Sequence, residues 1–288
     1  MKLIKLSSIT KKMSLAAVGL FLLIFLPIHA GINLCIMRSD SGYWYRNACH
    51  FMGTNYIVKV FEIILLATIV LHIVLAIILT VENYFARPIR YSTPHKTKTH
   101  WGSKYMIWTG GLIACFLILH FINFYFVKLN LVEGKYTAKI EKVDERFQNK
   151  VRQMQNGELN QTISNELASQ YEAINSISED KVSQKDKSFV NLTKNEVEKY
   201  CGKDFEDYEP DFYTMANDLF KNKIYTFIYL FIFVVLGIHL FHAINSVFQT
   251  FGFAHRKYEK YIEYLALIYA VVIPGLFAAV PVFVMFFK

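Results

Sequence analysis

The amino-acid sequence predicts an all-helical integral membrane protein with five transmembrane helices. Hydrophobic residues make up 54% of the 288 positions and charged residues 19%, whereas soluble domains have about 45–50% and about 25%. The mean hydropathy of +0.28 is nevertheless too low for a chain that lies in lipid over its whole length. We therefore expect several spanning helices and one sizeable polar segment. The composition excludes a disordered, collagen-like or disulfide-rich protein.

Five apolar stretches reach the length of about 20 residues that a helix needs to cross a bilayer. A polar segment of mixed charge follows the third stretch. It divides the chain into three helices in residues 1–128, an outer loop over 129–223 and two helices in 224–288. The predicted spans are Met13–Leu34, Tyr56–Val81, Tyr105–Val127, Ile224–Phe248 and Tyr261–Phe287.

Lys and Arg gather in alternate short connections, and this pattern predicts the orientation. Twelve of them lie on one side of the predicted membrane and three on the other. Because basic residues in short loops favour the cytoplasm, we expect a cytoplasmic N-terminus and a periplasmic C-terminus in a bacterial inner membrane. The net charge of +8 is then mostly a topology signal, and no nucleic-acid partner is expected. An alternative is a secretory signal cleaved after Ala30, which would remove His29.

Five of the nine His fall inside the predicted spans, on four of the five helices. One such His is usually a helix contact, but polar side chains are costly in lipid, so five of them favour a function. Imidazole is a common axial ligand of haem iron. The five residues are His29, His72, His120, His239 and His242.

Depth in the membrane sorts four of these His into two pairs. At about 1.5 Å of rise per residue, His29 and His120 lie about 24 Å and about 22 Å from the cytoplasmic ends of their helices. On the same scale, His72 and His239 lie about 16 Å and about 15 Å from those ends. Two pairs on four helices predict a four-helix bundle with two stacked haem b groups. We call His29 and His120 the outer pair, and His72 and His239 the inner pair.

Residues near the inner pair support this geometry. His242 lies three positions after His239 and can share its helix face, so it is an alternative ligand or a haem contact. Small residues lie at the same depth and either leave room for the inner haem or serve plain helix packing. They are Gly19, Gly110 and Gly111.

Glu62 is the only acidic residue in the interior of a predicted span. It is a candidate for proton exchange or for a hydrogen bond to a quinone near the outer haem. The alternative is a side chain that reaches the outer interface, where Lys59 can pair with it. In an oxidising compartment Cys35 can form a disulfide, with Cys49 or Cys201 as its partner.

Six segments match one family of membrane subunits in the same order along the chain. Together with the first helix they touch all five predicted spans. The segments are HFMGTN (His50–Asn55), LHIVLAIILTVENYFARPIRY (Leu71–Tyr91), WGSKYMIWTGGL (Trp101–Leu112), FYTMANDLFKNKIYTFIYL (Phe212–Leu230), HLFHAINSVFQTFGF (His239–Phe253) and YAVVIPG (Tyr269–Gly275). On these motifs the chain resembles the cytochrome b membrane anchor of succinate dehydrogenase or fumarate reductase, in the single-polypeptide class with five helices and two haems.

The resemblance implies a subunit of respiratory complex II that carries electrons between an iron–sulfur subunit and menaquinone. It implies two haem b groups, with His72 and His239 on the proximal one and His29 and His120 on the distal one. An iron–sulfur subunit and a flavoprotein subunit would bind on the cytoplasmic face, and the whole complex is expected to form a dimer. Without a GxGxxG motif or clustered Cys, the chain would not act on dicarboxylates alone.

Two departures from the family remain. Gly237 stands where some members carry a Glu, and residues 136–201 form an insertion of unknown role. Two other functions share parts of the pattern: a di-haem anchor of another quinone-linked oxidoreductase such as a hydrogenase, and a non-haem proton-coupled transporter. The sequence leaves open whether the complex oxidises succinate or reduces fumarate.

Overall fold

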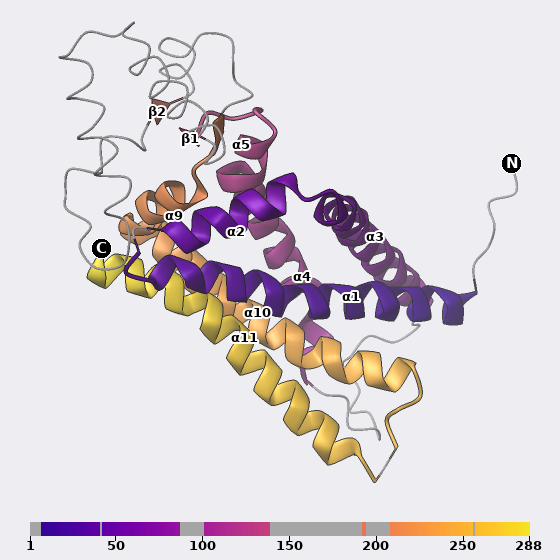
Figure 1. Cartoon of the computed structure of the whole chain (residues 1–288). Helices are drawn as coiled ribbons and strands as arrows, with labels where there is room; N and C mark the ends of the chain where they lie inside the picture. The colour runs from indigo at the N-terminus through magenta and orange to yellow at the C-terminus, as the bar shows by residue number, and fades with distance from the viewer. Residues whose placement is uncertain (1–6, 41, 87–100, 139–191, 194–207, 256) are drawn as a thin grey trace, which may run out of the picture. The chain divides into compact units, whose positions relative to one another are not determined.

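The computed structural model is mostly helical, and it describes residues 7–40, 42–86, 101–138, 192–193, 208–255 and 257–288. Five described helices are long and apolar enough to cross a bilayer, so the chain is a multi-pass membrane protein (Figure 1). They are α1 (Ser8–Leu34), α3 (Tyr56–Ala86), the helical segment Tyr105–Lys128 that begins within α4 (Trp101–His120), α10 (Lys223–Thr250) and α11 (Glu259–Phe287). The five predicted spans are thereby confirmed. Helix α1 begins five residues before the predicted start because the Ser7 side chain caps it, accepting a hydrogen bond from the Thr10 amide.

The chain divides into two compact units, which we describe separately. The first unit comprises Met1–Met37, Met52–Leu119 and Phe220–Lys288, and the second comprises Arg38–Phe51 and His120–Leu219. The first unit contains α1, α3, α10, α11 and nearly all of α4. The short 3₁₀ turn η1 (Cys35–Met37) continues α1.

Helices α10 and α11 lie side by side and form the best-packed part of the first unit (Figure 1). Buried residues along α11 recur at alternating spacings of four and three positions, which keeps one apolar seam facing the neighbouring helix. The α11 seam consists of Ala266, Ala270, Ile273, Phe277, Val280 and Val284. Helix α1 packs against α10, α11 and α3.

The closest approach of α10 to α11 depends on Gly237. A Cβ atom added there would lie 2.7 Å from the carbonyl oxygen of Ala270. Pro274 lacks the N–H that would normally bind the Ala270 carbonyl within the helix. The Glu that some members of the resembled family carry at this position would therefore not fit the packing seen here.

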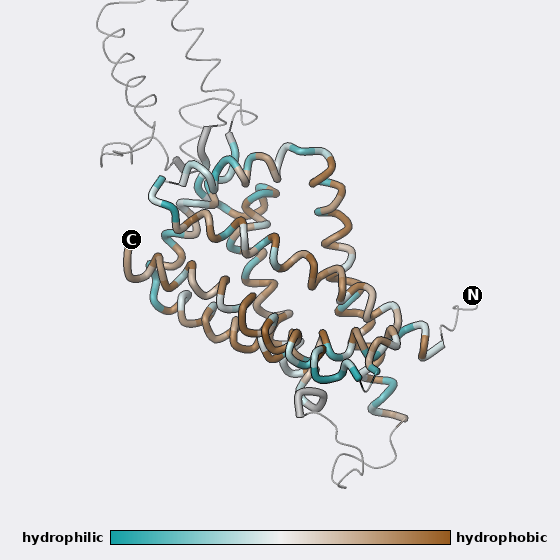
Figure 2. The backbone as a smooth tube through the Cα atoms, turned by 60° about the horizontal axis from the view of Figure 1, so that its bottom comes forward, coloured by the Kyte–Doolittle hydropathy of each residue, from teal (hydrophilic) through white to brown (hydrophobic). Residues whose placement is uncertain are grey.

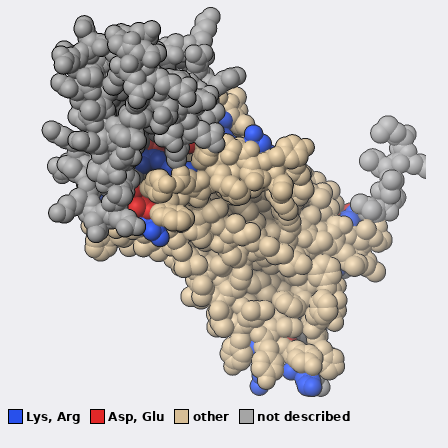
Figure 3. Space-filling model, in the orientation of Figure 1, with Lys and Arg blue, Asp and Glu red and all other residues tan. Residues whose placement is uncertain are grey.

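The long helices expose apolar side chains where lipid would surround them. Hydrophobic residues colour the middle of these helices in Figure 2, and hydrophilic residues lie toward their ends. On the face drawn in Figure 3, Lys, Arg, Asp and Glu are scarce along the helices and gather near helix ends. Extensive exposed apolar surface of this kind marks contact with a membrane.

The second unit contains the end of the third predicted span, which consists of a π-helical turn η2 (Phe121–Tyr125) and α5 (Phe126–Lys128). It also contains short elements where the sequence analysis expected only loops: α2 (Tyr43–Thr54), β1 (Lys135–Ala138), β2 (Leu192–Thr193), β3 (Tyr208–Pro210) and α9 (Phe212–Lys221). The strands form an antiparallel sheet in the order β2-β1-β3, with Tyr136 opposite Pro210 and Leu192. Tyr136 is 2% exposed and donates a hydrogen bond to Asn130 Oδ1, and burial raises the pKa of its phenol. The predicted insertion lies mainly outside the described residues.

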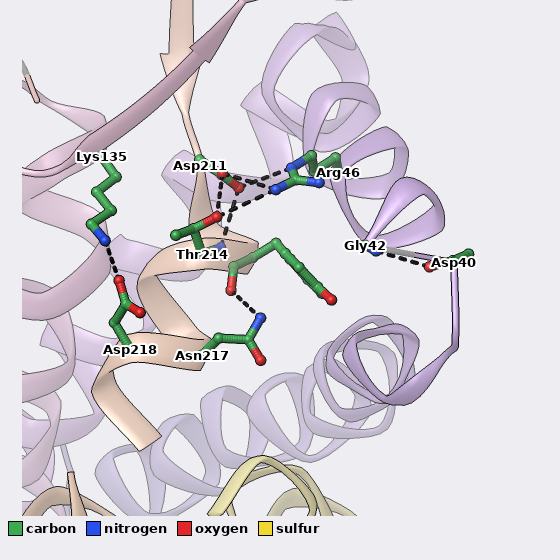
Figure 4. Close-up of polar contacts among 9 residues, drawn as sticks. Asp40, Gly42, Arg46, Lys135, Asp211, Thr214, Asn217 and Asp218 are labelled. Atoms are coloured by element: carbon green, nitrogen blue, oxygen red, sulfur yellow. Dashed lines mark hydrogen bonds and ion pairs between the residues drawn. The ribbon is translucent and has the colours of Figure 1, made fainter. Parts of the chain in front are cut away.

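A buried ion pair joins α2 to the start of α9 (Figure 4). Arg46 Nε and Nη2 each donate a hydrogen bond of 3.0 Å to one carboxylate oxygen of Asp211, which is 0% exposed. Asp211 also accepts hydrogen bonds from the backbone N–H and hydroxyl of Thr214, so it caps α9. The Arg46 guanidinium covers the ring of Tyr213. This pair therefore links segments that are 165 residues apart in the sequence.

Replacing Gly237 by Ala should lower the thermal stability of the purified protein. The added Cβ would meet a backbone oxygen at 2.7 Å, and such overpacking costs about 1–3 kcal/mol. Gly275→Ala on α11 is the matched control, because a Cβ at Gly275 meets nothing within 4 Å. Thermal unfolding in detergent measures both variants. Equal melting temperatures for the two would contradict the close approach at Gly237.

Replacing Arg46 by Met should destabilise the second unit far more than replacing Lys135 by Met. The first change leaves the buried Asp211 carboxylate unpaired, at a cost of about 3 kcal/mol or more. The second breaks the Lys135–Asp218 ion pair, whose side chains are 34% and 44% exposed, and such pairs contribute about 0–1 kcal/mol. Limited proteolysis followed by mass spectrometry compares opening of this unit. Equal sensitivity of the two variants would show that the Arg46–Asp211 pair is not a stabilising link.

Candidate functional site

The inner pair of His faces inward from two helices of the first unit. His72 on α3 and His239 on α10 have ring centroids 6.5 Å apart, with an angle of 68° between the ring planes. A bond from a metal ion to an imidazole nitrogen is about 2 Å long, so two rings on opposite sides of one ion have centroids roughly 6 Å apart. The structure thus brings together the two His that depth pairs, at a spacing that suits one shared metal ion.

Glycines lie against both rings of the inner pair. A Cβ added to Gly19 on α1 would lie 3.7 Å from His72 Cε1 and 3.9 Å from His72 Nδ1. A Cβ added to Gly110 on α4 would lie 3.6 Å from His239 Cε1. Each ring therefore turns its Cε1 atom toward a glycine of a neighbouring helix. Gly111, by contrast, is exposed, and a Cβ there meets nothing within 4 Å.

Contacts along the helices hold the inner pair at one level. An ion pair between Lys11 and Glu82 joins the start of α1 to the end of α3, which brings Gly19 level with His72. On α4, Phe116 packs edge-on against Tyr229 of α10, with ring centroids 4.8 Å apart. These contacts explain why residues from four different helices meet around the inner pair.

The chemistry of the inner pair fits a haem iron with two axial His. The Nδ1 atom of His72 is buried and has no hydrogen-bond partner among the described residues. No group of three or more His, Cys, Asp or Glu that could hold a metal ion occurs in the described part of the chain. A bis-His haem needs only two protein ligands, because the macrocycle supplies the others. Two imidazoles on facing helices, each beside a glycine, meet that need.

The outer pair is divided between the two units. His29 on α1 stacks on Phe25 with ring centroids 5.3 Å apart, and its ring lies 5.6 Å from that of Phe277 on α11. His120 is the last residue of α4 and belongs to the second unit, where its ring lies 5.2 Å from that of Phe124. The π-helical turn η2 follows His120 directly, and such turns are frequent at functional sites. The pairing of His29 with His120 stays a prediction.

A proline near His29 is compensated by a residue that the sequence analysis missed. Pro27 lies inside α1 and has no N–H to bind the Leu23 carbonyl four residues earlier. The hydroxyl of Tyr269 on α11 donates a hydrogen bond to that same carbonyl. In a membrane a freed carbonyl must find such a partner within the protein. Tyr269 therefore stabilises α1 at Leu23, six residues before His29.

The structure describes the exposure of most of the other candidate residues, and it assigns no role to them. His242 is partly buried on α10, and Glu62 is partly buried on α3. Lys59 is exposed. Cys35 has a free thiol, which lies 3.8 Å from the carbonyl oxygen of Gly31, so the disulfide that the sequence left open for Cys35 is not formed in the structure. Cys201 lies outside the described residues.

Thr109 is the second residue that the sequence analysis missed. It is 8% exposed on α4, and its hydroxyl lies 3.2 Å from His239 Nδ1. Its position directly before Gly110 and Gly111 was the available signal, because those glycines were assigned to the depth of the inner pair. A hydroxyl at that level is a candidate partner for an inner His.

Replacing Tyr269 by Phe should lower stability, because the Leu23 carbonyl then loses its partner. Interhelical hydrogen bonds in membranes are worth about 1 kcal/mol. The same substitution in a Pro27→Ala background should have little effect, since residue 27 then supplies the N–H. Thermal unfolding of the two single variants and the double variant in detergent measures this coupling. An equal loss in both backgrounds would mean that Tyr269 does not replace the missing N–H.

No family of known proteins matches this chain. No curated protein and no solved structure matches it either. The resemblance to the complex II anchors therefore remains a prediction carried by the motifs of the sequence.

Proposed function

We propose that this chain is the di-haem b membrane anchor of a succinate:menaquinone oxidoreductase or a quinol:fumarate reductase. The observation that carries the proposal is the inner pair, in which His72 and His239 face each other with ring centroids 6.5 Å apart. Glycines on two further helices lie against these rings. A helix contact between two His does not require a glycine beside each ring, whereas a site that must admit a flat macrocycle needs small neighbours.

In this proposal the chain's own residues hold and orient two haem groups. His72 and His239 would provide the axial nitrogens of the proximal group, and His29 and His120 those of the distal group. Each group supplies a reversible one-electron carrier when it is bound. The glycines at 19 and 110 place no Cβ against the two rings, and the helices around them are apolar.

Glu62 would act at the end of the electron-transfer path where the quinone binds. Reduction of a quinone consumes protons, and oxidation of a quinol releases them, so a carboxylate near the outer face can take up or give up a proton at its Oε atoms. Glu62 is partly buried on α3, ten residues from His72 toward the predicted periplasmic side. Menaquinone is the diffusible partner that the resemblance implies.

The identity of the partner enzyme rests on the motifs. An iron–sulfur subunit and a flavoprotein subunit would bind at the cytoplasmic face, which the distribution of Lys and Arg assigns to the N-terminal side. The described part of the chain is a multi-pass membrane protein in a lipid bilayer. That setting suits an anchor that carries electrons between a soluble catalytic unit and a membrane quinone.

Substituting either inner His by Ala should remove one haem and leave the other. Each variant loses one of two axial ligands of a single iron, so the haem content should fall from two groups per chain to one. Pyridine haemochrome assays on the purified complex measure this content. His242→Ala is the matched control, because His242 lies on the same helix as His239. This variant is expected to retain both haem groups.

Three outcomes would contradict the proposal in different ways. Absence of any b-type absorbance in the wild-type protein would favour a proton-coupled transporter. Loss of a haem in His242→Ala but not in His239→Ala would show that the fourth-helix ligand is misassigned. The chain could instead co-purify with a hydrogenase and without flavoprotein and iron–sulfur subunits that oxidise succinate or reduce fumarate. That result would contradict the proposed partner enzyme but would keep the proposal of a di-haem anchor.

A further inference from the structure

The hydroxyl of Thr109 has two neighbours inside the first unit. Its Oγ1 atom donates a hydrogen bond of 3.1 Å to the carbonyl oxygen of Met106, three residues earlier on α4. It also lies 3.2 Å from His239 Nδ1 on α10. Threonine often makes such a bond to its own helix. Because the side chain is 8% exposed, bulk water does not compete for these contacts.

Two arrangements of the hydrogens satisfy this contact. A hydroxyl group has one hydrogen, which can go to the Met106 carbonyl, an obligate acceptor, or to His239 Nδ1. When that hydrogen goes to Met106, the hydroxyl oxygen accepts from His239 Nδ1, and the hydrogen between the two residues belongs to the imidazole. A neutral imidazole with a hydrogen on Nδ1 keeps the lone pair on Nε2. Metal binding requires that lone pair.

The two His of the inner pair differ in the hydrogen-bond partner of their Nδ1 atoms. His239 Nδ1 has Thr109 as its partner, whereas His72 Nδ1 is buried and has no hydrogen-bond partner among the described residues. The residue before Gly19 on α1 is Val18, which has no hydroxyl, whereas the residue before Gly110 on α4 is Thr109. A glycine of a neighbouring helix thus lies against each ring, and among the described residues a side chain bonds to Nδ1 of His239 but not to Nδ1 of His72.

We propose that Thr109 is a positioning residue that fixes His239 as the Nδ1–H tautomer and directs Nε2 to the inner iron. This inference rests on the proposed function. Hydrogen bonds from the second nitrogen of a ligating His fix the ring and raise the basicity of the ligand, and their loss typically costs about 10–100-fold in metal affinity. A more basic ligand stabilises the oxidised iron more than the reduced iron, so Thr109 should lower the reduction potential of the inner haem.

Two variants distinguish the effect of the Thr109 hydroxyl from the effect of its methyl group. Thr109→Val keeps the methyl and removes the acceptor, so it should raise the potential of the inner haem and lower its occupancy. If the oxidised form loses tenfold more affinity than the reduced form, the shift is about 59 mV. Thr109→Ser keeps the acceptor and should behave as the wild type. Thr80→Val is the control, because the Thr80 hydroxyl also bonds to its own helix, at Ala76, but on an exposed face.

The experiment is a potentiometric titration of the purified complex followed by its b-type absorbance. The outer haem provides an internal reference, since its potential should stay unchanged in every variant. An unchanged inner potential in Thr109→Val, or a shift in Thr109→Ser of the same size, would overturn the role of the hydroxyl while leaving the di-haem anchor intact. A wild-type protein without haem would instead overturn the proposed function.

The tautomer can also be measured without haem. Nitrogen-15 NMR of labelled His in the haem-free chain distinguishes a protonated Nδ1 from a protonated Nε2. His239 should have the hydrogen on Nδ1 in the wild type and in Thr109→Ser, and should change in Thr109→Val. A hydrogen on His239 Nε2 in the wild type would contradict the inference directly.

Discussion

Every backbone polar group inside the hydrocarbon of a membrane must find a partner within the protein, and this constraint shapes the interior of the described helices. An unsatisfied backbone group there costs several kcal/mol. The Leu23 carbonyl, which Pro27 leaves without its helical donor, accepts the Tyr269 hydroxyl from α11. His239 Nδ1 has the Thr109 hydroxyl of α4. The interior is therefore specified by a few matched polar contacts placed among apolar side chains.

The packing of the long helices shows how such contacts are positioned. In an apolar stretch of 18 residues in each helix, 33% of the residues are buried in α10 and 39% in α11, against 6% in the span that contains α4. The α10–α11 pair is thus the most extensively packed pair of helices in the described part of the first unit, and it carries His239. Helices α1, α3 and α4 bring Gly19, His72 and Thr109 to the same level.

The sequence predicted the five spans because lipid imposes a strong, local requirement for apolar residues. It also paired His72 with His239, since rise along a helix converts residue number into depth. It did not predict α2, α9 or the small sheet, because these short polar elements depend on distant contacts such as Arg46 with Asp211. Thr109 and Tyr269 were missed for a related reason: each acts on another helix, and spacing within one helix does not indicate a partner on the next. The Cys35 disulfide was permitted by composition, but the structure leaves this thiol free.

The central claim is that two His pairs hold two haem groups in this chain. The most direct measurement is the haem-to-protein ratio of the purified wild-type protein, taken together with a redox titration of its b-type absorbance. The account predicts two haem b groups per chain that titrate at two different potentials. A ratio of zero, or a single haem with one potential, would contradict it.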